Sequence, residues 1–191
     1  MADKTRAQAL TELTASGQPF ELIPGSVFGR NCLRFRNAPE TLRNLYADAR
    51  SQMPFIVYGS ERLSFEETYA AAARVASVLV YDYGVKRGDR VAISMRNYPE
   101  WILSFMAVTA VGGIAVAMNA LWRPDEMGFG LLDSGAKVLI ADQERLDRFA
   151  DISPAINIDV IAVRPAANDH ATLADLVGAY ADVTEMPAPA P

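Results

Sequence analysis

The sequence predicts an α/β fold, with a mostly parallel sheet flanked by helices. Short, nearly continuous apolar runs at 90–95, 114–118, 136–141 and 157–163 are typical of buried parallel strands. They alternate with longer segments of helical periodicity, and glycines or capping residues separate the two kinds of segment. A chain of 191 residues, 51% of them hydrophobic and 21% charged, is long enough for one domain with a core.

The longest uncharged run, from Trp101 to Trp122, allows a second interpretation as a membrane span. Gly112 and Gly113 divide this run into a helix, capped by Asn97, and a short β-branched strand at 114–118. A bilayer span needs about 20 residues of unbroken helix. We therefore expect two buried elements of a layered sheet, with the membrane span as the alternative.

The remaining pattern suggests three parts: an N-terminal arm at 1–36, an α/β subdomain at 37–167, and a helix with an extended proline-rich tail at 168–191. The arm is expected to be polar or to form a short helix. A helix capped by Asn37 should begin the subdomain. Further helices are expected at 64–83, 124–134, 143–150 and 170–180.

Composition excludes several classes of function. The net charge of −5 argues against a nucleic-acid surface, and the three lysines and fifteen arginines form no polybasic run that would bind lipid. One cysteine, Cys32, cannot form an intramolecular disulfide and fits a reducing compartment. The N-terminal residues contain no apolar segment of the secretory type. We expect a cytoplasmic protein without a transmembrane segment.

The common catalytic motifs are missing from the sequence. It contains no phosphate-binding P-loop, no H-E-x-x-H, no cysteine cluster and no G-x-S-x-G. The single histidine, His170, is interpreted as a surface residue. We therefore expect no catalytic residue and no metal ligands in this chain. Such a chain is either a binding module or part of an enzyme.

Four motifs in order carry a resemblance to a known family: ERLSFEE at 61–67, GVKRGDRVAISMRNYPEW at 84–101, AVGGIAVAMN at 110–119 and LLDSGAKVLIAD at 131–142. Together they resemble the N-terminal part of an AMP-forming acyl-CoA synthetase, a member of the adenylate-forming ligases. The resemblance covers residues 37–150. The NALW that follows the strand is more similar to fatty-acyl and aryl-acid CoA ligases than to peptide synthetases.

The resemblance implies a two-step reaction. A carboxylate, with a fatty acid the expected class, attacks the α-phosphate of ATP, and the thiol of coenzyme A then displaces AMP. The whole enzyme would use ATP, coenzyme A and Mg²⁺. The family's phosphate loop, its adenylate-binding motifs and its C-terminal lysine are not in this sequence. We therefore expect a truncated chain that is inactive alone, binds none of these cofactors tightly, and has the rest of the ligase as its partner.

The resemblance also singles out Asn119 and Arg123 near a cleft for coenzyme A, because some members place a basic residue in this loop. The chain departs from the family pattern here: Met118 replaces a frequent proline, and Ala120 and Leu121 replace Pro-Arg. The competing interpretation is structural. Arg123 would then be a solvated side chain beside a helix start, and Asn119 would satisfy backbone groups at a strand end.

Two other functions remain open from the sequence. One is an autonomous nucleotide- or metabolite-binding α/β module, since ligands bind at the carboxyl ends of parallel strands. The other is a dimerisation or assembly module, because a missing neighbour would leave apolar surface exposed and favour a homodimer.

Overall fold

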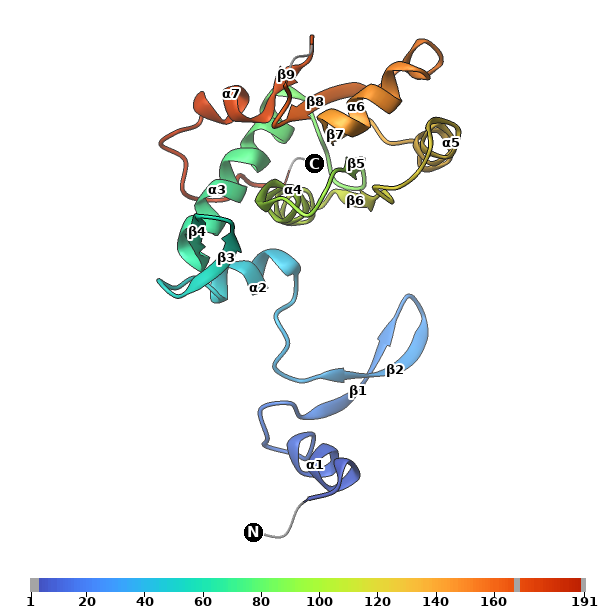
Figure 1. The fold of residues 1–191 in the computed structure, drawn as a ribbon. Coiled ribbons are helices and arrows are strands. Elements are labelled where there is room, and N and C mark those ends of the chain that lie inside the picture. Colours follow the sequence, from blue (N-terminus) through green and yellow to red (C-terminus); the bar gives the residue numbers. More distant parts are fainter. Residues whose placement is uncertain (1–3, 167–168, 190–191) are drawn as a thin grey trace. The chain divides into compact units, whose positions relative to one another are not determined.

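The computed structural model describes residues 4–166 and 169–189 (Figure 1). The chain divides into two compact units, Met1–Glu40 and Thr41–Pro191. The expected boundary between residues 167 and 168 lies outside the described residues, as do the last two residues of the proline-rich tail.

The N-terminal unit contains a helix and an antiparallel hairpin: α1 (Arg6–Leu13), β1 (Leu22–Val27) and β2 (Arg30–Phe35). The hairpin turns at Phe28 and Gly29, which both have positive φ. A polar arm or a short helix was expected here; α1 is such a helix, and the hairpin was not expected. Its strands are mostly exposed, so they lack the alternation of buried and exposed residues that marks a strand in a sequence.

The second unit is built on a five-stranded sheet whose strand pairs are all parallel, in the order β6-β5-β7-β8-β9. The expected α/β class with a mostly parallel sheet is confirmed. The strands are β5 (Arg90–Ser94), β6 (Ile114–Ala117), β7 (Val138–Asp142), β8 (Asp159–Val163) and β9 (Ala171–Thr172).

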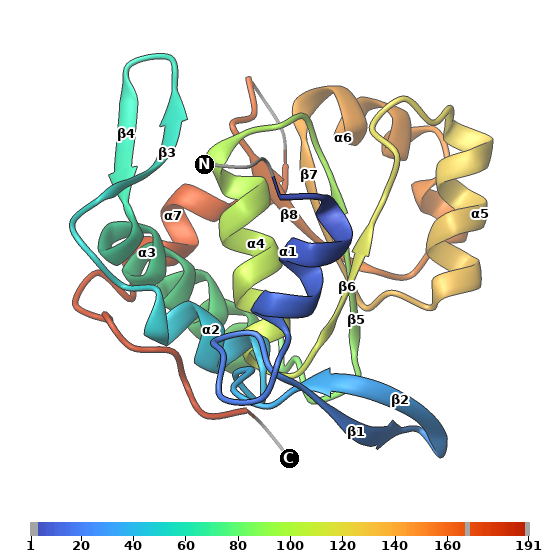
Figure 2. The same ribbon diagram turned by 90° about the horizontal axis from the view of Figure 1, so that it is seen from below.

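Helices cover both faces of this sheet (Figure 2). One face carries α3 (Phe65–Ser77), α4 (Pro99–Ala110) and α7 (Leu173–Gly178), and the other carries α5 (Pro124–Ser134) and α6 (Gln143–Ala150). A single π-helical turn, η1 (Val78–Asp82), extends α3, and a 3-10 turn, η2 (Ser153–Ala155), follows α6. Ahead of α3 lie α2 (Leu42–Asp48) and an antiparallel hairpin of β3 (Pro54–Tyr58) and β4 (Glu61–Ser64).

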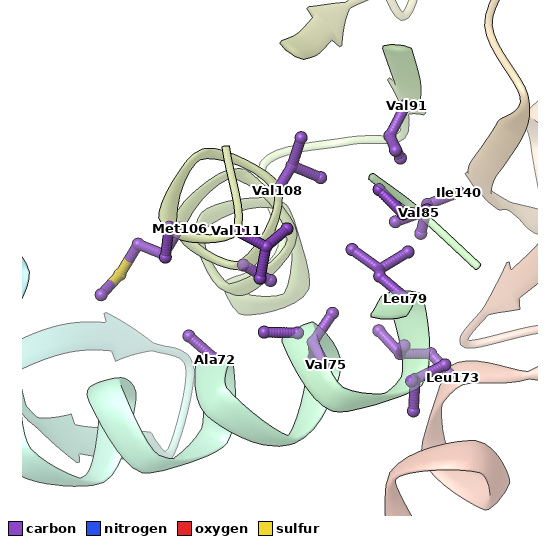
Figure 3. Close-up of a cluster of buried hydrophobic side chains, with 14 of the residues drawn as sticks. Ala72, Val75, Leu79, Val85, Val91, Met106, Val108, Val111, Ile140 and Leu173 are labelled. Atoms are coloured by element: carbon purple, nitrogen blue, oxygen red, sulfur yellow. The ribbon is translucent and has the colours of Figure 1, made fainter. Parts of the chain in front are cut away.

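Side chains that alternate along the strands pack into two separate hydrophobic cores, one on each face of the sheet. Val91 and Ile140 point to the face of α3 and α4, where they lie near Val75, Val108 and Val111 (Figure 3). The residues that alternate with these along each strand face α5 and α6 instead. They form a second core, which includes Ala92, Leu139, Ala141, Met127, Leu131 and Phe149. Strands with both faces buried explain why their sequences read as continuous apolar runs.

The uncharged run from Trp101 to Trp122 forms a helix and a strand, as expected. The expectation that both would be buried is wrong for the strand, because β6 lies at the edge of the sheet and none of its four residues is buried. It contributes most of α4, turns at Gly112 with φ of 81°, and continues as β6. Among the described residues, the structure has no helix of the length and apolarity required to cross a bilayer. The membrane-span interpretation of this run is therefore wrong.

Three helix starts differ from the expected ones. Thr41, not Asn37, caps α2, because its Oγ1 accepts the amide of Asn44 at 3.1 Å. Tyr98, not Asn97, precedes the first turn of α4. The segment expected to be helical from residue 170 begins instead as β9, and the helix starts after Thr172.

Candidate functional site

At the carboxyl ends of the parallel strands, the chain continues to different faces of the sheet after different strands. β5 continues into α4 on one face, whereas its neighbours β6 and β7 continue into α5 and α6 on the other face (Figure 2). The loops that follow these strands therefore diverge and leave a crevice between them, which is where ligands of open α/β sheets bind. This crevice is the candidate site.

Asp142, the last residue of β7, joins two of these loops. Its side chain is buried and caps α6, with Oδ1 accepting the amide of Arg145 at 3.2 Å. Oδ2 accepts the amide of Arg96, from the loop after β5, at 2.9 Å. The Arg145 guanidinium balances the charge, with Nη1 3.3 Å from both carboxylate oxygens. One buried carboxylate thus fixes the β5 loop against the start of α6.

Two arginines of α6 hold the loop after β6 by its backbone. Arg145 donates to the carbonyl of Ala120 through Nε, at 2.9 Å, and also through Nη2. Arg148 donates to the carbonyls of Ala120 and Trp122 at 2.9 and 2.8 Å. The fork of donors on a guanidinium suits this multiple contact. The conformation of the loop at 119–123 is therefore fixed by charged groups from a neighbouring helix.

Asn119 and Arg123 lie at the two ends of this loop. Asn119 Oδ1 accepts the amide of Leu121 at 2.9 Å, so the side chain satisfies a backbone group. Arg123 precedes α5, and its side chain is 76% exposed with the guanidinium 3.8 Å from the carboxylate of Asp125. The structure brings both residues into one loop and leaves Arg123 facing solvent.

A hollow of about 610 Å³ opens beside this loop. Its lining residues are Tyr58, Arg96, Asn97, Tyr98, Ala120, Leu121 and Arg145. The exposed cation of this set is Arg96, whose Nη2 lies 2.9 Å from Glu144. This contact lowers the pKa of Glu144 and raises the pKa of Arg96. A guanidinium with two tyrosines suits a ligand that has an anionic group and a flat ring.

The hollow contains no nucleophile with an adjacent base among its lining residues. In the part of the chain that the structure describes, His, Cys, Asp and Glu side chains form no group of three that could hold a metal ion. The arrangement can therefore bind and orient a ligand, and it offers no group that would break a bond in it.

Arg164 fixes one wall of the hollow. It follows β8 with a left-handed backbone, φ 48°, and its two terminal nitrogens each lie 2.9 Å from the carboxylate of Glu61. Nε donates to Glu100 at 2.8 Å, and the guanidinium lies over the rings of Tyr58 and Tyr98. The hydrogen bond to Glu61, followed by that to Glu100, raises the pKa of Arg164. The β3–β4 hairpin is thus tied to the start of α4.

Asn119 and Arg123 were expected from the sequence, whereas Arg96, Arg145 and Arg164 were not. The partners of Arg164 are 64 and 103 residues away in the chain, a separation that no local pattern reveals. For Arg145 one signal was present, because it follows the capping residue Asp142 by three positions. Its contact with Ala120 depends on the order of the strands.

Comparisons with known proteins identify the family that shares this sequence pattern. Residues 45–190 match the family of AMP-binding enzymes. The chain is 34% identical over 118 residues to the long-chain-fatty-acid–CoA ligase FadD13 of Mycobacterium tuberculosis, covering 62% of this chain and 21% of that protein. It is 29% identical over 110 residues to 4-coumarate–CoA ligase 3 of Arabidopsis thaliana, covering 56% of this chain and 19% of that protein. The chain thus spans about a fifth of the length of these relatives.

Solved structures agree on the fold. The anthranilate CoA ligase AuaEII, in complex with anthranoyl-AMP, superposes with a TM-score of 0.71 at 22% identity, over 78% of this chain and 29% of that one. A putative long-chain-fatty-acid CoA ligase from Rhodopseudomonas palustris gives 0.67 at 30% identity, over 79% and 38%. The chain therefore belongs to the AMP-binding enzymes, the family of adenylate-forming ligases, and has the fold of their N-terminal part.

Proposed function

We propose that the chain is the N-terminal portion of an ATP-dependent, AMP-forming ligase that activates a carboxylic acid as its acyl-adenylate and transfers the acyl group to coenzyme A. The observation that carries the proposal is the family match over residues 45–190. Relatives with a third of their aligned residues identical include CoA ligases for oxalate and for long-chain fatty acids. We propose a fatty acid as the substrate class, because FadD13 and the Rhodopseudomonas palustris structure both carry long-chain fatty acids in their names.

The residues of this chain are better suited to binding coenzyme A than to binding ATP and Mg²⁺. Coenzyme A carries phosphates and an adenine ring, and the hollow presents the Arg96 guanidinium beside Tyr58 and Tyr98. We place Asn119 and Arg123 at the rim of a coenzyme A cleft formed by the same loop. Here they would contact the cofactor while Arg145 and Arg148 keep the loop in position.

This chain lacks the sequence motif that would bind the phosphates of ATP, and its described residues form no cluster that would bind Mg²⁺. In this proposal, both groups bind to parts of the ligase outside these residues. The chain alone is then catalytically inactive and contributes scaffold and one wall of the clefts. The proposal includes a cytoplasmic location and a homodimer.

The proposed coenzyme A contact is tested by nuclear magnetic resonance. Titration of the chain with coenzyme A at millimolar concentration should shift the backbone signals of residues 119–123 and of Arg96. Arg123→Ala should weaken this response several-fold, because one phosphate contact is lost. The matched control is Arg87→Ala. Arg87 is an exposed arginine in the turn before β5, at the amino ends of the strands and not at their carboxyl ends. Equal binding by both variants, or no shift in the loop of the unmodified chain, would contradict this placement.

Catalytic dependence on further polypeptide is tested separately. The chain is incubated with ATP, Mg²⁺, coenzyme A and a panel of fatty and aromatic acids, and pyrophosphate and thioester are measured. No product is expected. Thioester formation by these residues would refute the proposed inactivity. Tight binding of ATP or AMP in calorimetry would instead favour the autonomous nucleotide-binding module.

A further inference from the structure

Two tyrosine rings in the wall of the hollow come from different elements of the second unit. Tyr58 ends β3, and Tyr98 lies just before α4. Their ring centroids are 5.7 Å apart and the ring planes meet at 87°, which is an edge-to-face arrangement. A ring pair that is built from a hairpin and a helix start keeps this geometry only if a third group ties the two elements together.

Arg164 provides this connection. Its guanidinium carbon lies 5.3 Å from the ring centroid of Tyr58 and 5.2 Å from that of Tyr98, within cation–π range of both. The same guanidinium donates two hydrogen bonds of 2.9 Å to Glu61, at the start of β4, and one of 2.8 Å to Glu100, in the first turn of α4. The described residues that line the hollow do not include Arg164. It therefore acts on the rings and not on a ligand.

The backbone of Arg164 is in the left-handed region, with φ of 48°. A residue other than glycine rarely adopts this conformation, because its Cβ comes close to the following carbonyl oxygen. Backbone strain of this kind persists only where the surrounding structure fixes it, and it is found preferentially at functional sites. The contacts of the guanidinium explain why an arginine occupies a position that the backbone alone would give to glycine.

We propose that Arg164 is a positioning residue for the ligand of the hollow: it holds Tyr58 and Tyr98 as a fixed pair that receives a flat ring. The inference rests on the proposed function, in which the ligand is coenzyme A and the ring is its adenine. It adds that the affinity has two separable parts. Ring contacts depend on Arg164, whereas the attraction between Arg96 and the phosphates does not.

The test uses the complete chain and two probes. Adenosine 3′,5′-bisphosphate carries a ring and phosphates, and inorganic pyrophosphate carries charge without a ring. Glu61→Gln weakens the tie to Arg164 at an exposed residue, so it should cost little stability. We expect the dissociation constant of the nucleotide to rise about fivefold and that of pyrophosphate to stay within about twofold. Arg164→Lys should act in the same direction, because an ammonium group cannot form the two-pronged contact.

Glu66→Gln is the matched control. Glu66 also accepts two hydrogen bonds from one arginine, Arg50, whose guanidinium carbon lies 4.5 Å from the ring centroid of Tyr69. The substitution changes the net charge by the same amount as Glu61→Gln, and none of these three residues is among the described residues that line the hollow. Both dissociation constants should therefore stay within about twofold of the native values.

The chain is labelled with 3-fluorotyrosine, so that fluorine magnetic resonance reports both binding and ring geometry. In the absence of a probe, Glu61→Gln should shift the signals of Tyr58 and Tyr98, and Glu66→Gln should leave them in place. In the native chain the nucleotide should shift both signals.

Three results would overturn the inference, and they differ in what else they refute. If the nucleotide shifts both tyrosine signals but Glu61→Gln and Arg164→Lys bind it as tightly as the native chain, Arg164 has no positioning role and the coenzyme A placement stands. If the variants lose pyrophosphate affinity to the same degree, the arginine supports the whole hollow and not the rings. If the nucleotide shifts neither signal in the native chain, the coenzyme A placement fails and the inference fails with it.

Discussion

Arg145 is 2% exposed, yet its charge is compensated on several sides. It contacts the buried carboxylate of Asp142, the carboxylate of Glu144 and the carbonyl of Ala120. A charge removed from water is costly unless it is paired and hydrogen-bonded, and here each requirement is met by a different element. The arginine therefore acts as a connection between β7, α6 and the loop after β6.

We predict that Arg145→Ala lowers the free energy of unfolding by about 3 kcal/mol, because the buried Asp142 loses its compensating charge. Urea denaturation measures the change. Arg123→Ala is the matched control: it removes an arginine side chain that is 76% exposed, so its effect should stay within about 0.5 kcal/mol. Equal losses in the two variants would show that the Asp142–Arg145 contact adds little stability.

Gly128 and Gly130 lie in α5, where glycine weakens a helix by about 1 kcal/mol relative to alanine. Their surroundings differ. A Cβ at Gly130 would lie 2.6 Å from Cζ3 of Trp122, whereas at Gly128 the nearest atom, Cδ1 of Ile152, would be 3.4 Å away. Gly130 is therefore required by the packing of the indole against the helix, and Gly128 is not.

Alanine substitutions at these two positions should have opposite effects. Gly128→Ala should raise the free energy of unfolding by about 0.5–1 kcal/mol through helix propensity alone. Gly130→Ala should lower it by about 1–3 kcal/mol, because Trp122 must move. Denaturation curves give both values, and tryptophan fluorescence should change for Gly130→Ala only. Stabilisation by both substitutions would mean that the indole moves without cost.

At the scale of elements, α3 begins with a complete capping box. Ser64 Oγ accepts the amide of Glu67 at 3.1 Å, and the Glu67 carboxylate accepts the amide of Ser64 at 2.7 Å. The spacing of Ser64 and Glu67 in the sequence predicts this box, because both partners are local. The backbone hydrogen bond from Ser64, with its side-chain hydrogen bond, lowers the pKa of Glu67 below the usual 4.5.

This lowered pKa gives α3 a defined response to acid. A depressed carboxylate pKa stabilises the fold above the unfolded value and loses that contribution as pH falls through the folded value. The difference in unfolding free energy between the native chain and Glu67→Gln should therefore be largest near neutral pH and shrink below pH 4.5. Chemical denaturation at several pH values measures it.

Glu40→Gln is the control for this measurement, since Glu40 is exposed and lies outside the helices. Its difference from the native chain should not follow the same course with pH. A constant difference for Glu67→Gln between neutral pH and pH 3 would contradict the capping argument.

At the scale of the whole molecule, the two units differ in how much apolar surface they bury. Among the described residues, every buried apolar side chain lies between Ile56 and Pro187. The N-terminal unit has a two-stranded hairpin and an eight-residue helix without a buried residue. An isolated hairpin and a short helix are each marginal in water.

We predict that residues 41–191 fold without the first 40 residues, because both cores are contained within them. A chain that starts at Thr41 should show dispersed amide signals and a cooperative thermal transition. The peptide of residues 1–40 should show neither. An unfolded or molten 41–191 chain would contradict the prediction and imply that the N-terminal unit contributes to a core.

The local elements of the second unit could largely be predicted, because each depends on neighbours in sequence. The apolar runs gave β5 to β8, and Gly112 and Gly135, both with positive φ, marked the ends of α4 and α5. The prediction failed where local signals were weak or tied. Thr41 rather than Asn37 caps α2, and the β1–β2 hairpin has no buried face to produce alternation.

The candidate site was only partly predictable for a related reason. Asn119 and Arg123 belong to one loop and could be named from a short motif. The groups that hold that loop, Arg145 and Arg148, contact its carbonyl oxygens from 25 to 28 residues away. Backbone carbonyls carry no residue identity, so no sequence pattern marks such a contact.

The sequence by itself determined the class of the fold, the family and the division of the uncharged run into α4 and β6, because hydrophobic periodicity and glycine act over a few residues. Only the tertiary structure decided the strand order β6-β5-β7-β8-β9 of the described residues, and with it the crevice and the pairing of Asp142 with Arg145. These depend on which segments pack together over long distances in the chain. That choice is made by the burial of both sheet faces at once and not by any local preference.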